Sequence, residues 1–208
     1  LVSNDTDWAK VDLGALHTVA LKENGTIWGW GNNDNFSLSS SNNPPYYFTV
    51  PIQLSPTNDW TDISAGASRT FAIKNDGTLW ARGNNINYGL GLPSPVFFNE
   101  FTQVGTATNW KKVKSPVLNN FSIGLKTDNT LWGWGDNFFG AVGVAQLAYI
   151  TQPTQIGTAT WSDFAVSSNL TVGIQTNGTL WYWGKGALDT FTNTIFPVAS
   201  NVPIQVGT

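Results

Sequence analysis

The 208-residue chain has no cysteine, no methionine and a single histidine, His17. Without cysteine the chain can form neither a disulfide nor a thiolate metal site, and one histidine cannot build a zinc-binding cluster. A Ser-His-Asp triad would have one candidate base at most, because only His17 could take that role. The sequence therefore predicts no catalytic residues, no cofactor and no metal site.

Charge is also scarce. Charged residues make up 11% of the chain and the net charge is −3. A chain of this kind lacks the basic surface that attracts a phosphate backbone, so we expect no nucleic-acid partner. No apolar run approaches the roughly 20 residues needed to cross a bilayer, and we expect no membrane insertion.

What the chain does contain is a repeated segment rich in tryptophan and glycine. It reads KENGTIWGWGNN at 22–33, KNDGTLWARGNN at 74–85, KTDNTLWGWGDN at 126–137 and QTNGTLWYWGKG at 175–186. Another tryptophan opens each unit, at positions 50 to 52 residues apart: Trp8, Trp60, Trp110 and Trp161. Periods of this length indicate a tandem array. The predicted repeats are 8–59, 60–109, 110–160 and 161–208 in one region covering 1–208, with 1–7 as the tail of a preceding unit.

Each repeat has the signals of about four short strands. An alternating stretch follows the opening tryptophan, a turn pair divides a hairpin, and a short stretch such as VPIQL closes the unit. The turn pairs are Asn24-Gly25, Asp76-Gly77, Asp128-Asn129 and Asn177-Gly178. Such pairs are typical of two-residue type I′ turns, and Asp128-Asn129 is the weaker signal because it lacks glycine. Four antiparallel strands in about 50 residues are the proportions of a β-propeller blade, which predicts an all-β fold.

Such a turn would place Val19, Leu21, Trp28 and Trp30 on one face of the hairpin. The opposite face would then carry only small residues, and blades would stack large face on small. In this interpretation the glycines make room for the indoles of the next blade. The predicted structural core is Trp28, Trp30, Trp80, Trp132, Trp134, Trp181, Trp183, Gly29, Gly31, Gly133 and Gly135.

The repeat pattern, W-x-x-[VI]-x-x-G-x-x-H-T-x-A-L-K-x-[ND]-G-T-[IL]-W-x-W-G-x-N, resembles the regulator of chromosome condensation (RCC1) repeat family. Bacterial and phage repeats rich in NGTLWxWG are the most similar in sequence. The resemblance implies a β-propeller, commonly of seven blades, so we expect the four units to belong to a larger array. The family's G-Q-L-G segment is altered at 36–39, 88–91 and 140–143 and is lost in the fourth unit. His17 is replaced by other residues in the later units, which favours a packing or hydrogen-bonding role over a catalytic one.

Three functions are compatible with this sequence. The first is a non-enzymatic structural or binding module of a phage virion or cell surface, extracellular, in contact with other protein chains, additional blades or surface glycan. The second is an intracellular regulatory scaffold or guanine-nucleotide exchange factor of the kind that the resemblance implies. The third is a glycan-active enzyme that uses paired carboxylates from separate blades. We favour the first hypothesis, with no enzymatic activity.

Candidate partner-binding residues lie in the variable loops, where a repeated scaffold tolerates change. The aromatic candidates are Phe36, Tyr46, Tyr47, Phe97 and Phe98. The only two arginines, Arg69 and Arg82, join them, because the predicted hairpin places both on one face within reach of each other. They would either stack on a tryptophan and bind carbonyl groups or hold an anion between them.

Overall fold

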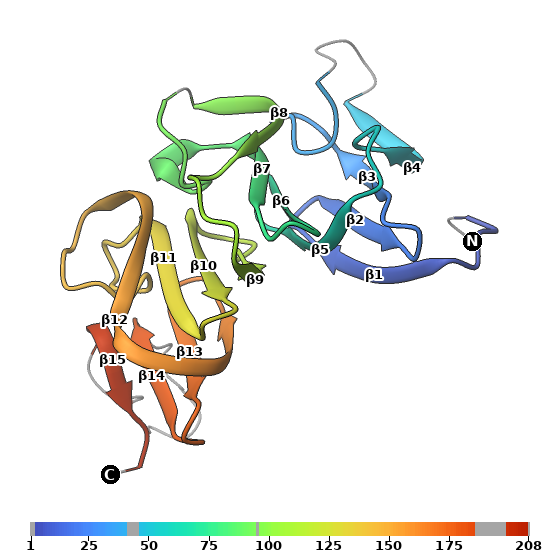
Figure 1. Ribbon diagram of the computed structural model, residues 1–208. Helices are drawn as coiled ribbons and strands as arrows, with labels where there is room; N and C mark the ends of the chain where they lie inside the picture. The colour runs from blue at the N-terminus through green and yellow to red at the C-terminus, as the bar shows by residue number, and fades with distance from the viewer. Residues whose placement is uncertain (1–2, 41–45, 95, 186–198, 208) are drawn as a thin grey trace, which may run out of the picture.

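The computed structural model describes residues 3–40, 46–94, 96–185 and 199–207, and these form a nearly all-β structure with one 3-10 turn, η1 (Ile86–Tyr88) (Figure 1). The strands of the first two repeats are β1 (Trp8–Leu13), β2 (His17–Lys22), β3 (Ile27–Asn32), β4 (Tyr47–Gln53), β5 (Trp60–Ala65), β6 (Arg69–Lys74), β7 (Leu79–Asn84) and β8 (Phe97–Gln103). Those that follow are β9 (Trp110–Lys114), β10 (Phe121–Lys126), β11 (Thr130–Asp136), β12 (Tyr149–Val166), β13 (Leu170–Gln175), β14 (Leu180–Gly184) and β15 (Ser200–Gln205).

The strands form four antiparallel blades in chain order. Blade one is β1-β2-β3-β4 and blade two is β5-β6-β7-β8. The 18-residue strand β12 belongs to two blades, because its first part pairs with β11 and its last part, from Trp161, pairs with β13. Blade three is therefore β9-β10-β11-β12, and blade four starts in the second half of β12. The predicted propeller-blade architecture is confirmed.

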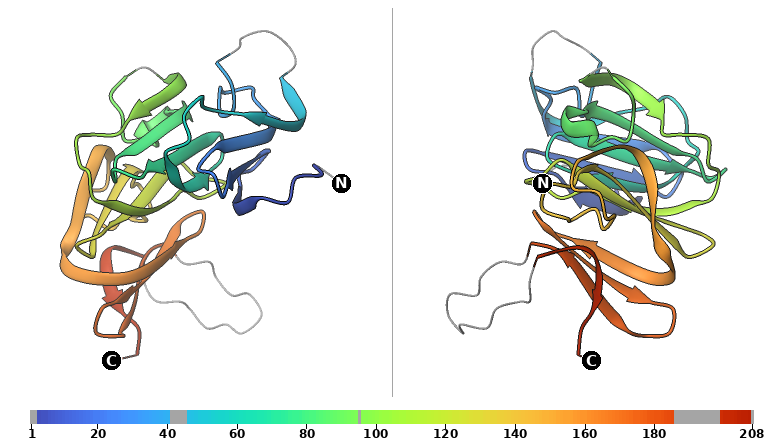
Figure 2. Two further views of the ribbon diagram at one scale, coloured as in Figure 1. Left: turned by 45° about the vertical axis from the view of Figure 1, so that its right-hand side comes forward. Right: turned by 90° about the vertical axis from the view of Figure 1, so that its left-hand side faces the viewer.

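Successive blades lie side by side along an arc, with the two ends of the chain at its opposite ends (Figures 1 and 2). The first strands of neighbouring blades contact each other, β1 with β5 and β5 with β9. Ion pairs link these inner strands: Lys10 lies 2.8 Å from Asp62, and Lys114 of blade three lies 2.9 Å from Asp12 of blade one. A contact between blades one and three places the first strands nearest the axis of the arc.

The hairpin turns differ from the sequence prediction. Between β2 and β3, the Lys22 amide donates to the Thr26 carbonyl at 3.0 Å, so the loop has three residues rather than two. Only Gly25 of the predicted pair has a positive φ, 80°, as expected for a three-residue loop that ends in a left-handed residue. The predicted two-residue turn is therefore wrong.

This one-residue difference moves side chains to the other face of the sheet. Thr18 pairs with Trp30 and Val19 with Gly29, so both tryptophans of β3 share a face with Thr18 and not with Val19. The predicted division into a bulky face and a small face is wrong for the same reason. Both faces of each blade carry large side chains.

The glycines of the third strands make room within their own blade. A Cβ on Gly29 would lie 2.5 Å from Leu38 Cδ2, and one on Gly133 would lie 2.7 Å from Val142 Cγ1. Leu38 and Val142 both come from the turn that follows the strand in the same blade. The prediction that these glycines accommodate a neighbour's indole is therefore wrong.

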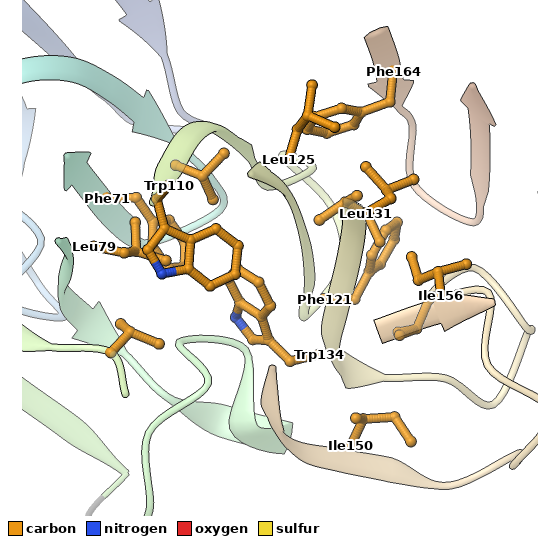
Figure 3. Close-up of a cluster of buried hydrophobic side chains, with 14 of the residues drawn as sticks. Phe71, Leu79, Trp110, Phe121, Leu125, Leu131, Trp134, Ile150, Ile156 and Phe164 are labelled. Carbon is orange, nitrogen blue, oxygen red and sulfur yellow. The ribbon is translucent and has the colours of Figure 1, made fainter. Parts of the chain in front are cut away.

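The core runs through the junctions between blades, as the buried cluster in Figure 3 shows for blades two and three. Phe71 of β6 contacts Trp134 of β11 with ring centroids 6.1 Å apart, and Trp110 of β9 packs edge-on against Trp134 at 5.8 Å. Of the predicted core residues, Trp134, Trp183, Gly29, Gly133 and Gly135 are buried, whereas Trp28, Trp30, Trp80, Trp132, Trp181 and Gly31 are half-buried. Burial of each indole removes about 150–250 Å² from water, which makes these junctions strongly stabilising.

Candidate partner-binding face

Three blades carry the same turn after their third strand, at 33–39, 85–91 and 137–143. Each turn is built around a buried asparagine. The side-chain oxygen of Asn33 accepts from the Leu38 amide at 2.9 Å, and Asn137 accepts from the Val142 amide at 2.9 Å. In blade two Asn85 accepts from the amide five residues later at 3.1 Å. These bonds satisfy main-chain donors that the turn would otherwise leave buried and unpaired. The corresponding segment of the fourth repeat lies outside the described residues.

Each turn also accepts a hydrogen bond from the next blade. Thr70 donates to the Ser37 carbonyl at 2.7 Å, and Ser122 donates to the Gly89 carbonyl at 2.9 Å. Trp134 adds a second bond, from its indole nitrogen to the Gly89 carbonyl at 3.1 Å. The turns are therefore rigid parts of the junctions, and side chains that project from them are held in place.

Two of these turns contain a strained aromatic residue. Phe36 and Tyr88 have φ values of 60°, whereas the equivalent residue of blade three is Gly140, with φ of 77°. The left-handed region disfavours bulky side chains by about 1–2 kcal/mol per residue. Strain of this kind is kept where the surrounding structure fixes it, and it often marks functional positions.

Each strained residue contacts a ring of the next blade. Phe36 contacts Phe97 with centroids 6.2 Å apart, Tyr88 contacts Tyr149 at 6.3 Å, and Tyr149 contacts Phe138 at 5.0 Å. We call these five rings, together with the exposed rings of Tyr46, Tyr47 and Phe139, the aromatic arc; it consists of Phe36, Tyr46, Tyr47, Tyr88, Phe97, Phe138, Phe139 and Tyr149. All but Phe36 and Tyr88 are exposed, and those two are half-buried. The rings stand in the turns, or at or immediately before the start of the paired strands β4, β8 and β12, and exposed rings in such number form an apolar surface of the kind that marks interaction sites.

The structure brings together several residues that the sequence predicted separately. Phe36 of the first repeat and Phe97 of the second lie next to each other. Tyr46 and Tyr47 are exposed, and the Tyr46 carbonyl accepts from the Asn33 amide of the first turn at 2.7 Å. Phe98 instead packs against the core, because alternate residues of β8 point to opposite faces. The sequence analysis did not single out the other four rings of the arc. Their signal was present, since Tyr88 occupies the position of Phe36 in the next repeat.

The arginines are placed differently from the prediction. Arg69 is fully buried and points toward blade three, where its Nη2 donates to the Asn119 carbonyl at 3.0 Å and to the Asn120 side chain. Arg82 points toward blade one, where its Nε donates to the Phe36 carbonyl at 3.0 Å. Because Thr70 pairs with Arg82, the two arginines lie on opposite faces of blade two.

No anion can therefore be held between the two guanidinium groups, and that interpretation is wrong. Arg82 also lies over the Phe101 ring at 5.4 Å and donates to the Asn99 carbonyl at 2.6 Å. Burial lowers the pKa of both arginines to about 10, so both stay charged at neutral pH. Their role is to join blades through carbonyl groups, which guanidinium donors do well.

His17 lies at the junction of blades one and two, where its Nε2 is 3.2 Å from Thr70 Oγ1. Burial lowers its pKa to about 4. Within the described ranges, no three His, Cys, Asp or Glu side chains are grouped closely enough to hold a metal ion. No helix in the same part of the chain is long and apolar enough to cross a membrane.

Comparison with known proteins identifies the family. Sequence profiles described as "Regulator of chromosome condensation (RCC1) repeat" match residues 8–36, 60–89 and 119–141, and a second profile of the same description matches 24–73. Together these matches cover just over half of the chain. The chain belongs to the RCC1 repeat family.

Two curated relatives show the range of RCC1 repeat proteins. The chain is 26% identical to "RCC1 domain-containing protein RUG3, mitochondrial" of Arabidopsis thaliana over 74% of its length and 35% of the relative. It is 28% identical to the "Regulator of chromosome condensation" of Homo sapiens over 69% of its length and 34% of the relative. The chain therefore spans about a third of the length of these two relatives.

Solved structures share the RCC1 fold. Human WBSCR16 superposes on 99% of this chain with a TM-score of 0.86 and 16% identity, and the match covers 56% of that chain. The yeast RCC1 protein Prp20, in a structure with Kap60 bound, gives a TM-score of 0.82 at 18% identity over 99% of this chain and 50% of its own. A further structure of Prp20p is titled for its binding to Gsp1p and histones.

These relatives correct two expectations from the sequence. The favoured virion or cell-surface role is wrong, because the matching proteins are regulators of the RCC1 kind. The extracellular location is wrong as well, since the relatives are named for the mitochondrion and for chromosome condensation, both inside the cell. The adhesive role, the glycan partner and the bacterial or phage type of the repeats gain no support from them.

Proposed function

We propose that this chain is the protein-binding propeller of an RCC1-type regulatory protein and that it acts by binding rather than by catalysis. Its four repeats, 8–59, 60–109, 110–160 and 161–208, would serve as one region. The names of the relatives support a regulatory role, and the titles of the Prp20 structures support binding to proteins. The observation that carries the proposal is the aromatic arc.

The arc has the composition and rigidity of a binding surface. Aromatic side chains are enriched in the centres of protein interfaces, and a few of them usually provide most of the binding free energy. Tyr47, Phe97 and Phe138 are 60%, 41% and 53% exposed and come from three different blades. Tyr47 and Phe97 stand in the paired strands β4 and β8, and Phe138 stands in a turn that is hydrogen-bonded to blade four, so these rings lose little further freedom when a partner binds.

A small GTPase is the partner class to test first. Two relatives are named as GTPase regulators, "Rho GTPase-activating protein gacGG" and "X-linked retinitis pigmentosa GTPase regulator". We therefore propose exchange or scaffolding at a GTPase as the regulatory activity, with the arc as the surface that contacts it. The buried arginines would support the arc from below and would not touch the partner.

The experiment is affinity capture with two matched triple variants. Tyr47→Ser, Phe97→Ser and Phe138→Ser together remove three rings of the arc. Ile174→Ser, Leu180→Ser and Val202→Ser remove three side chains of blade four that are 41%, 45% and 42% exposed, and this variant serves as the control.

The wild-type chain and the control are expected to recover the same protein from an extract of the organism that encodes the chain, and the arc variant is expected to lose it. Purified small GTPases are then titrated against the same three proteins. Equal recovery by the arc variant would contradict the proposal.

A further inference from the structure

Three blades contain a lysine held between two indoles at the end of the second strand. The Lys22 ammonium lies 4.8 Å from the Trp8 ring and 5.1 Å from the Trp28 ring. Lys74 and Lys126 have the same arrangement in blades two and three, with Lys126 only 3.7 Å from the Trp132 ring. We call each lysine with its two tryptophans a lysine cage. Blade four has Gln175 at this position.

The chain itself shows which group fills such a cage. Lys22 forms ion pairs with Asp5 at 2.9 Å and with Asp7 at 3.0 Å. Lys74 forms one with Asp59 at 3.0 Å. Asp7 and Asp59 each stand immediately before the tryptophan that opens the repeat. The natural ligand of a lysine cage is therefore a carboxylate.

The third cage has no carboxylate paired with its lysine among the residues that the structure describes. The residue before Trp110 is Asn109, and its side chain donates to Asp128 at 3.2 Å. Asp128 in turn accepts from the Thr130 amide and hydroxyl at 3.0 and 2.6 Å. The Lys126 ammonium has no hydrogen bond or ion pair to any residue that the structure describes.

Lys126 is nevertheless almost fully buried, with 8% of the residue exposed. The Lys126 ammonium is not itself fully buried, so its three donors can be reached by a ligand from outside. Its pKa is lowered because burial outweighs the attraction of Asp128. The equivalent lysines of the other two cages use their donors on aspartates.

The third cage opens onto a cavity of about 750 Å³ between blades two and three. Trp110, Lys126 and Trp132 line one part of it. Polar residues that are suited to bind a peptide main chain line much of the rest: Ser94, Gln103, Thr106, Thr151 and Gln152. A volume of this size is in the range of ligand-binding clefts.

We propose that the lysine cage of blade three binds a carboxylate from outside, on an acidic segment of a partner polypeptide that lies in this cavity. The acidic side chain would take the place that Asp59 takes beside Lys74. The inference does not depend on the aromatic arc as the main binding surface, so the two proposals can fail separately.

The probe is a fluorescein-labelled hexaglutamate peptide, with hexaglutamine as its neutral counterpart, and binding is followed by fluorescence anisotropy. The net charge of the chain is −3, so attraction to an acidic peptide must come from a local site. The wild-type chain is expected to bind the glutamate peptide at least 10-fold more tightly than the glutamine peptide.

Three variants localise this preference. Lys126→Met removes the charge and is expected to abolish the preference. Asn109→Asp keeps the lysine but supplies a carboxylate at the position of Asp59. This carboxylate is expected to occupy the cage and to weaken binding of the glutamate peptide at least 10-fold. Lys74→Met alters a cage that is already filled and should leave peptide binding unchanged, which controls for lost packing.

The indole N–H signals of Trp110 and Trp132 provide a local reading by NMR, and both are expected to shift with the glutamate peptide only. A chain that binds the two peptides equally, or an Asn109→Asp variant that binds as the wild type does, overturns the proposal. Equal shifts with acetate or inorganic phosphate at the same concentration would overturn the polypeptide ligand and assign the cage to small anions.

Discussion

His17 makes the stability of the protein depend on pH between 6.5 and 4. Its imidazole is buried between blades one and two. The Thr70 hydroxyl donates its hydrogen to the Ser37 carbonyl at 2.7 Å, so Thr70 Oγ1 acts as the acceptor for His17 Nε2 at 3.2 Å. A neutral imidazole satisfies this arrangement, whereas the charged form must also be desolvated, which is unfavourable.

The magnitude follows from the pKa of His17, about 4 in the folded protein against an ordinary value of 6.5. As pH falls below 6.5 the unfolded chain takes up the proton first, so stability decreases until the pH reaches the folded pKa. At about 1.4 kcal/mol per pH unit, the full loss is about 3 kcal/mol, of which about 2 kcal/mol is reached at pH 5. The aspartates with lowered pKa, such as Asp163, lose their contribution only as pH falls below the ordinary value of 3.8.

The assay is urea unfolding of the wild-type chain and of His17→Gln at pH 7.5, 6.5, 5.5 and 5.0. Glutamine can donate to Thr70 but does not titrate in this range. The unfolding free energy of the wild type is expected to fall by about 2 kcal/mol across the series, and that of the variant to change by much less. Parallel losses in the two proteins would refute the assignment to His17.

Two further predictions concern the turns that follow the third strands. Gly133→Leu is expected to lower the unfolding free energy by more than about 2 kcal/mol, because its Cβ would lie 2.7 Å from Val142 Cγ1; an unchanged melting temperature would contradict this packing. Tyr88→Gly is expected to leave stability unchanged or to raise it by up to about 1 kcal/mol, because relief of the left-handed strain offsets the greater freedom of glycine and the lost ring contact. A clear loss in thermal unfolding would show that the turn is not strained.

Much of the fold could be predicted from the repeat itself. The spacing of Trp8, Trp60, Trp110 and Trp161 and the recurring turn pairs predicted four-stranded blades, and the structure confirms them. The threonine of each turn and the following tryptophan are always two residues apart, and this spacing also has a structural reason. In each hairpin the indole nitrogen donates to the threonine hydroxyl two residues earlier, as Trp28 does to Thr26 at 2.9 Å.

The register could not be predicted, because Asn-Gly suits both a two-residue turn and the end of a three-residue loop. That single residue decides which face each side chain occupies. The error carried over to Arg69 and Arg82, which were expected on one face and lie on opposite faces of blade two. It also assigned Gly29 and Gly133 to the wrong neighbours.

The candidate site was partly visible in the sequence. Aromatic loop residues indicated a binding surface. Phe97 is exposed and Phe98 packs against the core because alternate residues of a strand point to opposite faces, and composition does not reveal which residue points outward. The strain at Tyr88 requires backbone angles. The third lysine cage does have a sequence signal, the change from Asp7 and Asp59 to Asn109, yet its meaning depends on the contacts of Lys126.

The central claim is that the aromatic arc binds a protein partner, and the most direct test is the dissociation constant for the protein that affinity capture recovers. Removal of Tyr47, Phe97 and Phe138 is expected to weaken binding at least 100-fold, since loss of interface rings commonly costs about 1–2 kcal/mol or more each. The matched variant of Ile174, Leu180 and Val202 should bind as the wild type does. Equal dissociation constants for the wild-type chain and the arc variant, with both folded, would contradict the account.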